Sequence, residues 1–158
     1  MNNIDTVIII ERAISELRRG GKIVVTDNNN NTSVLLIAAE MIDKRTVEDF
    51  ISITSSRPSV ILSSNRSKAL NLPNNNLPSS ILIEKKWSVE DIMSICMPIT
   101  SHKTPILNGV LFEKENQITS LCLLILRQAH LLPAGLTSII STVPIEEISN
   151  WCKKNNLI

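Results

Sequence analysis

The fold is decided by a segment that reads VIIIERAISELRRGGKIVVTD over residues 7–27. Its apolar side chains recur at helical spacing with charged residues between them, which predicts an amphipathic helix. The inner face of this helix is expected to carry Val7, Ile10, Ile14 and Leu17. Gly20 and Gly21 end it, because glycine readily adopts the left-handed conformation of a C-terminal cap. The β-branched run 22–27 then predicts a strand, which leads into four asparagines.

The rest of the chain continues this alternation of helices and strands, with no internal repeat and no dividing linker. Strands are expected at 34–39 (where a buried helix start fits the same apolar run), 60–62, 81–83, 106–112 and 136–143. Helices are expected at 46–54, 65–70, 88–96, 119–130 and 144–155, with N-caps at Thr46, Ser88 and either Thr119 or Ser120. This order predicts a single domain over residues 1–158 of the α/β class, in its α+β layered form. We expect one mixed twisted sheet with helices packed on it.

Charge and aromatic content exclude several classes of partner. Sixteen basic residues stand against 15 acidic ones, for a net charge of +1, so bulk charge does not support binding to a phosphate backbone. Aromatic residues make up 3% of the chain, too few for a platform that stacks bases or sugars. No apolar run approaches the ~20 residues that a membrane span needs. We therefore expect no nucleic-acid partner and no membrane partner.

The cysteines and the first residues indicate a compartment. The chain has three cysteines without Cys-x-x-Cys spacing: Cys96, Cys122 and Cys152. Such cysteines are typical of small buried side chains in a reducing compartment. The first residues include Asn2, Asn3 and Asp5, where an export signal would carry positive charge. The expected location is cytoplasmic.

Few side chains form a pattern that indicates catalysis. The chain has no phosphate-binding loop and no metalloprotease or nucleophile-elbow motif. Asp27 and the asparagines after it are expected to form a hydrogen-bonding loop at a strand end, a common place for a ligand site. His102 lies in a polar run and is either a site residue or a solvated loop histidine. His130 fits a helix C-terminus, and Glu146 and Glu147 complement the dipole of the last helix.

Five segments follow one another in the order of a known enzyme family. They are IERAISELRRGGKIVVTD (10–27), LLIAAE (35–40), RSKALNLP (66–73), the helix exit HLLPAG (130–135) and the closing stretch 144–157. Together they resemble 3,4-dihydroxy-2-butanone 4-phosphate synthase, a riboflavin-pathway lyase that converts ribulose 5-phosphate to a four-carbon phosphate and formate. The resemblance covers nearly the whole chain. It implies the fold of that family and a homodimer with the site at the subunit interface.

The positions at which that family holds its substrate and metal carry other residues in this chain. The resemblance places its acidic loop Arg-Glu-Asn-Glu-Gly-Asp on residues 29–34, where only the asparagine is retained and no acid occurs between Asp27 and Glu40. Its Arg-x-Gly-His-Thr-Glu motif falls on residues 115–120. The departures are Glu115 for the phosphate-binding arginine, Ile118 for the metal-binding histidine, Ile92 for an arginine, Ile139 for the catalytic glutamate and Ser59 for the active-site cysteine.

The resemblance with these departures implies a catalytically degenerate lyase domain. Metal, base and phosphate contacts are lost together, so we expect no intact catalytic residue, no metal ligand and no cofactor. The remnant candidates are Asp27, Asn30, Asp91 and His102, with Asn29 and Thr119 as candidate substrate or phosphate contacts. The expected role is that of a structural, dimerising or regulatory domain. We expect the chain to form a homodimer and to be linked to a GTP cyclohydrolase II domain. Two alternatives stay open: a residual Mg-dependent lyase that uses Asp27, Asp91, His102 and Thr119, and a sensor that binds a small phosphate through Thr119 and the asparagine loop.

Overall fold

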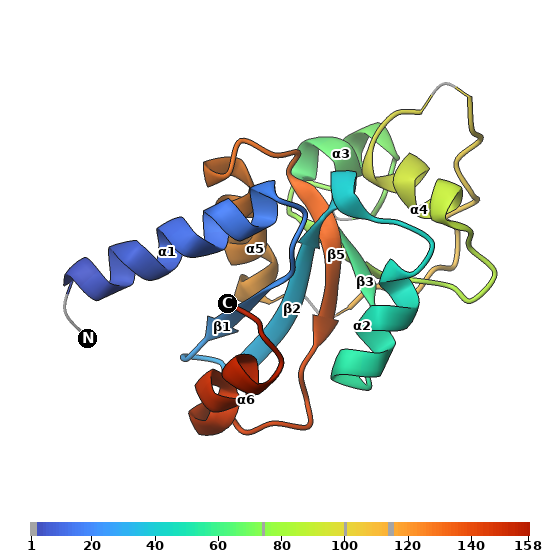
Figure 1. The fold of residues 1–158 in the computed structure, drawn as a ribbon. Helices are drawn as coiled ribbons and strands as arrows, with labels where there is room; N and C mark the ends of the chain where they lie inside the picture. The colour runs from blue at the N-terminus through green and yellow to red at the C-terminus, as the bar shows by residue number, and fades with distance from the viewer. Residues whose placement is uncertain (1–2, 74, 100, 114–115) are drawn as a thin grey trace.

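A computed structural model describes residues 3–73, 75–99, 101–113 and 116–158, which form a five-stranded sheet with helices on both faces (Figure 1). The strands are β1 (Ile23–Asp27), β2 (Thr32–Ala38), β3 (Ser59–Leu62), β4 (Ser79–Leu82) and β5 (Ala134–Ile139). The helices are α1 (Asn3–Arg18), α2 (Thr46–Thr54), α3 (Ser64–Ala69), α4 (Val89–Cys96), α5 (Gln117–Gln128) and α6 (Ile148–Lys154), with 3₁₀ helices η1 (Ala39–Met41) and η2 (Ile145–Glu147). None of the helices in the described ranges is long and apolar enough to cross a membrane.

The sheet has the strand order β1-β2-β5-β3-β4, and every pairing is antiparallel. The expected α+β layered class is confirmed, whereas the pairings differ from the mixed sheet that was expected. The reason is the position of β5, which inserts between β2 and β3. β2 and β3 are both antiparallel to β5 and so run parallel to each other, but β5 lies between them and they do not pair. The order of elements along the chain does not reveal such a late insertion.

Each face of the sheet is covered by its own helices. α2 and α4 pack on one face, and α1 and α5 pack on the other. β2 contributes to both cores, since Leu35 packs with Phe50 of α2 whereas Leu36 packs with Leu126 of α5. A strand buried on both faces reads as a continuous apolar run. This is why the sequence did not separate the strand from a buried helix start.

The first helix is confirmed, but much of its expected inner face is exposed. Leu17 is fully buried, whereas Val7 is 53% and Ile10 is 44% exposed. Figure 1 shows the reason, because the first turns of α1 extend beyond the sheet and the other helices. Gly20 follows the helix with φ +85°, the left-handed conformation that the sequence predicted.

Several element ends differ from the sequence expectations. The N-cap of α4 at Ser88 is confirmed, and Ser88 forms a capping box with Asp91. Asp43 stabilises the start of α2, where its Oδ1 accepts a hydrogen bond from the Thr46 backbone nitrogen at 3.0 Å, and Asn116 caps α5. Residues 106–112 are not assigned to a strand, and Phe112 forms only an isolated bridge to β4. β5 ends at Ile139, and the last helix is divided into η2 and α6.

Candidate functional site

Asp27 organises the turn between β1 and β2. It is 5% exposed, and its Oδ1 accepts a hydrogen bond from the Asn29 backbone nitrogen at 3.0 Å. Its Oδ2 accepts another from Asn30 Nδ2 at 2.6 Å. Asn31 completes the turn with φ 48°, a conformation that asparagine tolerates better than most residues. The structure thus brings Asp27, Asn29 and Asn30 together, with both carboxylate oxygens engaged in holding the turn.

Asp91 and His102 form a second pair beside α4. His102 Nε2 lies 2.9 Å from Asp91 Oδ1, and Asp91 Oδ2 accepts a hydrogen bond from the Ser88 backbone nitrogen at 2.8 Å. The hydrogen bond to His102, followed by that from the Ser88 backbone, lowers the pKa of Asp91 below its ordinary value of 3.8. The pair fastens the segment after α4 to the start of that helix. It lies away from the Asp27 turn, which joins the edge strand β1 to β2 (Figure 1).

The Asp91 pair predicts a pH dependence of stability. Because the folded-state pKa of Asp91 is depressed, the unfolded chain takes up this proton first as the pH falls. The stabilisation by charged Asp91 is therefore present above its unfolded pKa, near 3.8, and is lost as the pH drops through the lower folded value. Denaturant unfolding of the wild type and Asp91→Asn should give a difference in free energy at neutral pH that vanishes in acid. A difference that stays constant over this range would contradict the assignment.

A cavity of about 490 Å³ lies beside the β1–β2 hairpin. We call it the hairpin cavity; its lining residues are Asn31, Thr32, Ser33, Asn116, Ile139, Ile140, Ser141, Val143, Pro144, Ile145 and Glu146. These residues come from the hairpin, from the N-cap of α5 and from the chain that follows β5 into η2. Glu146 is the single carboxylate among the described lining residues. Glu146 was expected only to complement the dipole of the last helix, and no sequence pattern shows that η2 brings it to this cavity.

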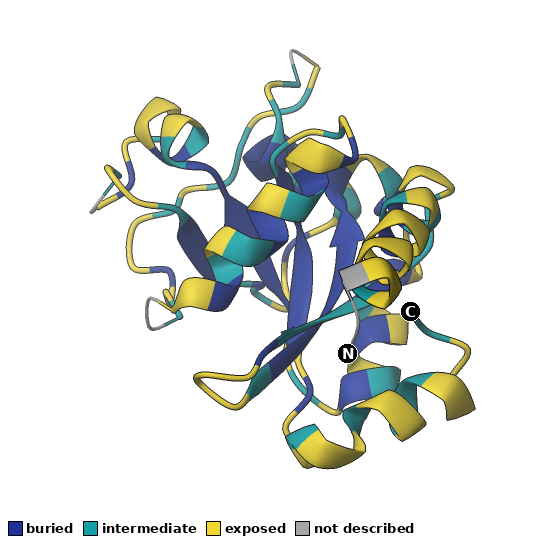
Figure 2. Ribbon diagram, turned by 90° about the vertical axis from the view of Figure 1, so that its left-hand side faces the viewer, coloured by how far each residue is buried: buried dark blue, intermediate teal, exposed yellow. Residues whose placement is uncertain are grey.

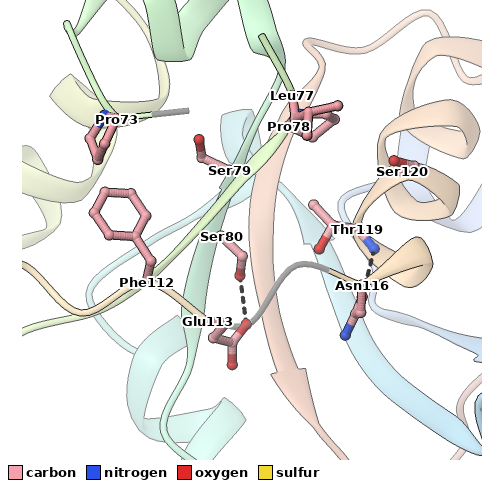
Figure 3. A pocket seen from close by; sticks show the side chains of 10 residues that line it. All are labelled: Pro73, Leu77, Pro78, Ser79, Ser80, Phe112, Glu113, Asn116, Thr119 and Ser120. Carbon is pink, nitrogen blue, oxygen red and sulfur yellow. Dashed lines mark hydrogen bonds between the residues drawn. The ribbon is translucent and has the colours of Figure 1, made fainter. Parts of the chain in front are cut away.

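A second cavity of about 250 Å³ also has Asn116 in its lining (Figure 3). We call it the serine cavity; its lining residues are Pro73, Leu77, Pro78, Ser79, Ser80, Phe112, Glu113, Asn116, Thr119 and Ser120. Figure 3 shows Glu113 directed at Ser80, whose Oγ donates a hydrogen bond to Glu113 Oε2 at 2.5 Å. Asn116 Oδ1 accepts hydrogen bonds from the backbone nitrogens of Ile118 and Thr119 at 3.0 and 3.3 Å. No sequence pattern points to Glu113 and Ser80, because they are 33 residues apart and share no motif.

The structure brings together part of the set of positions that the resemblance assigns to a lyase site. Three positions of the acidic loop, 31–33, line the hairpin cavity with Asn116 and Ile139. Ile118, at the position of the metal-binding histidine, is instead 3% exposed and packs in the core under α5. Thr119 lines the serine cavity, whereas Asn29 lies in the turn and lines neither cavity. Glu115 lies outside the described residues.

Ser59 occupies the position of the family's active-site cysteine and is buried in β3. It is 1% exposed, and its Oγ has no hydrogen-bond partner among the residues that the structure describes. Its neighbour across the β3–β5 pairing is Thr137, which is also buried. A buried hydroxyl without a partner costs about 1–3 kcal/mol, so a polar pair is a less stable choice here than an apolar one. Ser59 and Thr137 thus form a buried polar pair between β3 and β5.

The cavities offer few groups for binding an anion or a metal. Over the described ranges, no lysine, arginine or histidine lines either cavity, and no group of three or more His, Cys, Asp or Glu side chains could hold a metal. Mg²⁺ prefers near-octahedral oxygen ligands that include carboxylates and substrate phosphates. The hairpin cavity supplies Glu146, which is exposed, with neutral hydroxyl and amide oxygens. This donor set does not fit a resident Mg²⁺.

The cysteines do not provide a nucleophile at these cavities. Burial raises the pKa of Cys96 and of Cys122 to about 12, so both thiols stay protonated at neutral pH. Cys96 belongs to the core under α4, and Cys122 belongs to the core under α5. Cys152 is partly exposed on α6, and burial raises its pKa as well. The expectation of small buried side chains holds for the first two cysteines.

The comparisons with known proteins define the fold. The sequence matches no protein-family model and no curated protein. The structure is similar to a two-domain 3,4-dihydroxy-2-butanone 4-phosphate synthase from A. baumannii, with a TM-score of 0.72 and 20% identity over 94% of this chain and 54% of that chain. The chain thus spans about half the length of that two-domain protein.

Two further structures cover nearly the same part of this chain. The synthase of Candida albicans has a TM-score of 0.70 and 18% identity over 94% of this chain and 90% of that chain. A synthase in complex with two magnesium ions has a TM-score of 0.69 and 16% identity over the same shares. The strand insertion, the helices on both faces and the hairpin beside α5 therefore belong to one known architecture: the chain has the fold of 3,4-dihydroxy-2-butanone 4-phosphate synthase.

Proposed function

We propose that this chain is a degenerate relative of 3,4-dihydroxy-2-butanone 4-phosphate synthase that no longer catalyses the lyase reaction. Its role is then that of a structural, dimerising or regulatory domain in riboflavin biosynthesis. The observation that carries this proposal is the lining of the hairpin cavity. Positions 31–33, 116 and 139 meet there as the resemblance requires, but the described lining holds one carboxylate and no cation.

The chemistry of the reaction explains why this lining is insufficient. Ribulose 5-phosphate brings a phosphate dianion, whose desolvation requires charged or strongly donating partners. Rearrangement of a ketose also needs a base to remove protons and an electrophile to stabilise the developing oxyanion. A single exposed Glu146 supplies at most one of these functions. We therefore propose that the chain acts without a cofactor.

The alternative of a residual Mg-dependent lyase is less well supported. Its residues would have to act together, yet Asp27 uses both carboxylate oxygens in the turn, and Asp91 pairs with His102 beside α4. Thr119 lines the serine cavity, which shares only Asn116 with the hairpin cavity. Incubation of the purified chain with ribulose 5-phosphate and Mg²⁺ tests the proposal, because a degenerate domain should leave the sugar phosphate unchanged.

Titration calorimetry with ribulose 5-phosphate distinguishes a sensor from a structural domain. The Thr119 hydroxyl at the serine cavity could donate a hydrogen bond to a polyol, and this supports the sensor as a second candidate. Saturable heat without turnover would favour the sensor. An Asn116→Ala variant, altered at the residue common to both cavities, should then lose that heat.

We also propose that the chain works with a GTP cyclohydrolase II domain, in the same polypeptide or in a complex. The A. baumannii synthase is a two-domain protein, so this fold occurs joined to a second domain in that case. GTP turnover by a separately purified cyclohydrolase II, with and without this chain, measures a regulatory effect. Equal turnover together with no binding in sedimentation would oppose the partnership.

A further inference from the structure

A third cavity, of about 560 Å³, lies between α2 and the segment that leads from β4 into α4. We call it the α2–α4 cavity. Figure 1 shows α2 and α4 on the side of the sheet away from α1 and α5. The α2–α4 cavity is larger than the hairpin cavity and the serine cavity, and it shares no lining residue with either. Its volume lies within the ~300–1,000 Å³ that is typical of small-molecule sites.

The inner part of this cavity is apolar. Figure 2 shows the central strands of the sheet as buried, and the cavity reaches this interior at Ile83, directly after β4. Trp87 is buried beside it in the same core. Val47 and Ile51 line the opposite wall and stand four residues apart on α2, so they share one face of that helix. An apolar ligand that entered here would exchange water for apolar side chains.

Trp87 is not the residue that stability alone favours in this wall. Its Nε1 is buried and has no hydrogen-bond partner among the residues that the structure describes. A buried donor without a partner destabilises the folded chain, and phenylalanine would fill an apolar wall without that cost. The indole ring, however, offers a wide flat face, and aromatic side chains of this kind commonly line ligand pockets.

One positive charge is held at the edge of the apolar wall. Arg57 lines the cavity, and its Nε donates a hydrogen bond to the backbone oxygen of Ile83, which holds the guanidinium against the wall. The two terminal nitrogens of Arg57 have no hydrogen-bond or salt-bridge partner in the described ranges. Together they can donate to both oxygens of one carboxylate, a geometry that arginine favours.

The other charges of the lining do not select a ligand. Two cations and two acids lie exposed at the rim, so their charges cancel: Lys44, Lys85, Glu48 and Glu90. Glu84 is half-buried and is already paired with Lys86, whose Nζ lies 2.8 Å from Glu84 Oε2. The charge of Arg57, which a hydrogen bond holds in place, therefore decides the sign of the ligand.

We propose that the α2–α4 cavity binds a small carboxylate with an aromatic, apolar body. The body packs against Trp87 and the α2 wall, and the carboxylate accepts hydrogen bonds from the terminal nitrogens of Arg57. A sugar phosphate fits poorly, because apolar walls leave its hydroxyls without hydrogen-bond partners. The inference goes beyond the proposed function, since it concerns the other face of the sheet and does not depend on the loss of lyase activity.

Titration with 4-phenylbutyrate, followed by NMR of the two tryptophan indole N–H signals, tests this proposal. Trp87 lines the cavity, whereas Trp151 lies on α6 and is not among the lining residues; Trp151→Phe assigns the two signals. A saturable shift of the Trp87 signal alone is expected, with a Kd of about a millimolar for so small a ligand. 4-Phenylbutyramide lacks the charge and butyrate lacks the ring, so each should bind at least about tenfold more weakly.

Two variants test the two parts of the site. Arg57→Gln removes the positive charge and should weaken binding of 4-phenylbutyrate by about tenfold, with a smaller effect on the amide. Arg127→Gln is the matched control, because Arg127 is exposed on α5 across the sheet, and it should bind like the wild type. Ile51→Glu places a like charge in the apolar wall and should abolish binding, without altering the contact between Arg57 and Ile83.

Three results would overturn the proposal. The first is no shift of the Trp87 signal at about 10 mM probe, ten times the expected Kd. The second is an equal shift of both indole signals, which would indicate non-specific association. Equal affinities for the acid and the amide would overturn the assignment of a carboxylate. None of these results bears on the lyase reaction, which formate release measures separately.

Discussion

Replacing Phe50 with alanine is expected to lower the free energy of unfolding by about 3–5 kcal/mol. Phe50 is fully buried between α2 and the sheet, where it belongs to the core with Leu35 and Ile92. Truncation to alanine removes the ring from this core and leaves a cavity that neighbouring strands cannot fill, since their backbones are fixed by hydrogen bonds. Denaturant unfolding followed by circular dichroism measures the change.

Ile51→Ala is the matched control for this prediction. Ile51 is the next residue on the same helix, and it is 48% exposed. Both side chains are apolar, so the pair also tests which face of α2 meets the core. We expect Ile51→Ala to change the free energy of unfolding by no more than about 1 kcal/mol. Equal losses for the two variants would contradict the burial pattern.

Gly135→Ala is expected to destabilise the protein by about 2–3 kcal/mol through overpacking. A Cβ at this position of β5 would lie 2.6 Å from the backbone oxygen of Ile37 in β2, and 3.4 Å from Leu126 of α5. The backbone oxygen belongs to the neighbouring strand and cannot move aside without disturbing the pairing. The close approach of the β2 backbone therefore requires glycine at this position of β5.

Gly109→Ala is the control that distinguishes the steric clash at Gly135 from the loss of glycine's backbone freedom. Gly109 has φ +79°, and a Cβ there would have no atom within 4 Å. Its replacement strains the backbone without a clash, at a cost of about 1 kcal/mol. A Gly135→Ala variant that is as stable as Gly109→Ala would show that the sheet accommodates the methyl group.

The sequence predicted the parts of the fold that depend on local pattern. Helical spacing and Gly20 defined the end of α1, and the Ser88–Asp91 pair defined the start of α4. Periodicity identifies the apolar face of a helix, but it does not show how far the sheet and the other helices extend along that face. The sequence therefore predicted Val7 as buried, although the sheet and the other helices do not reach it. The antiparallel pairing depends on the insertion of β5, a long-range contact that no local pattern encodes.

The candidate site was less accessible to prediction from the sequence. The Asp27 turn was predicted as a hydrogen-bonding loop because aspartate before asparagines favours such turns. Pairing of Asp91 with His102 depends on the path of the chain after α4, which the sequence does not specify. Glu146 and Glu113 border the two cavities through contacts between distant segments. Glu146 was expected only to complement the dipole of the last helix, and no sequence pattern pointed to Glu113.

Formate release from ribulose 5-phosphate in the presence of Mg²⁺ tests the central claim most directly. The control is a 3,4-dihydroxy-2-butanone 4-phosphate synthase with its acidic loop intact, and Glu146→Gln of this chain removes the one carboxylate of the hairpin cavity. The account predicts no formate above the blank, since loss of a base alone slows such chemistry by ~10²–10⁴-fold, and here metal and phosphate contacts are missing as well. Formate at even a thousandth of the control rate, abolished in Glu146→Gln, would contradict the account and make Glu146 a working catalytic group.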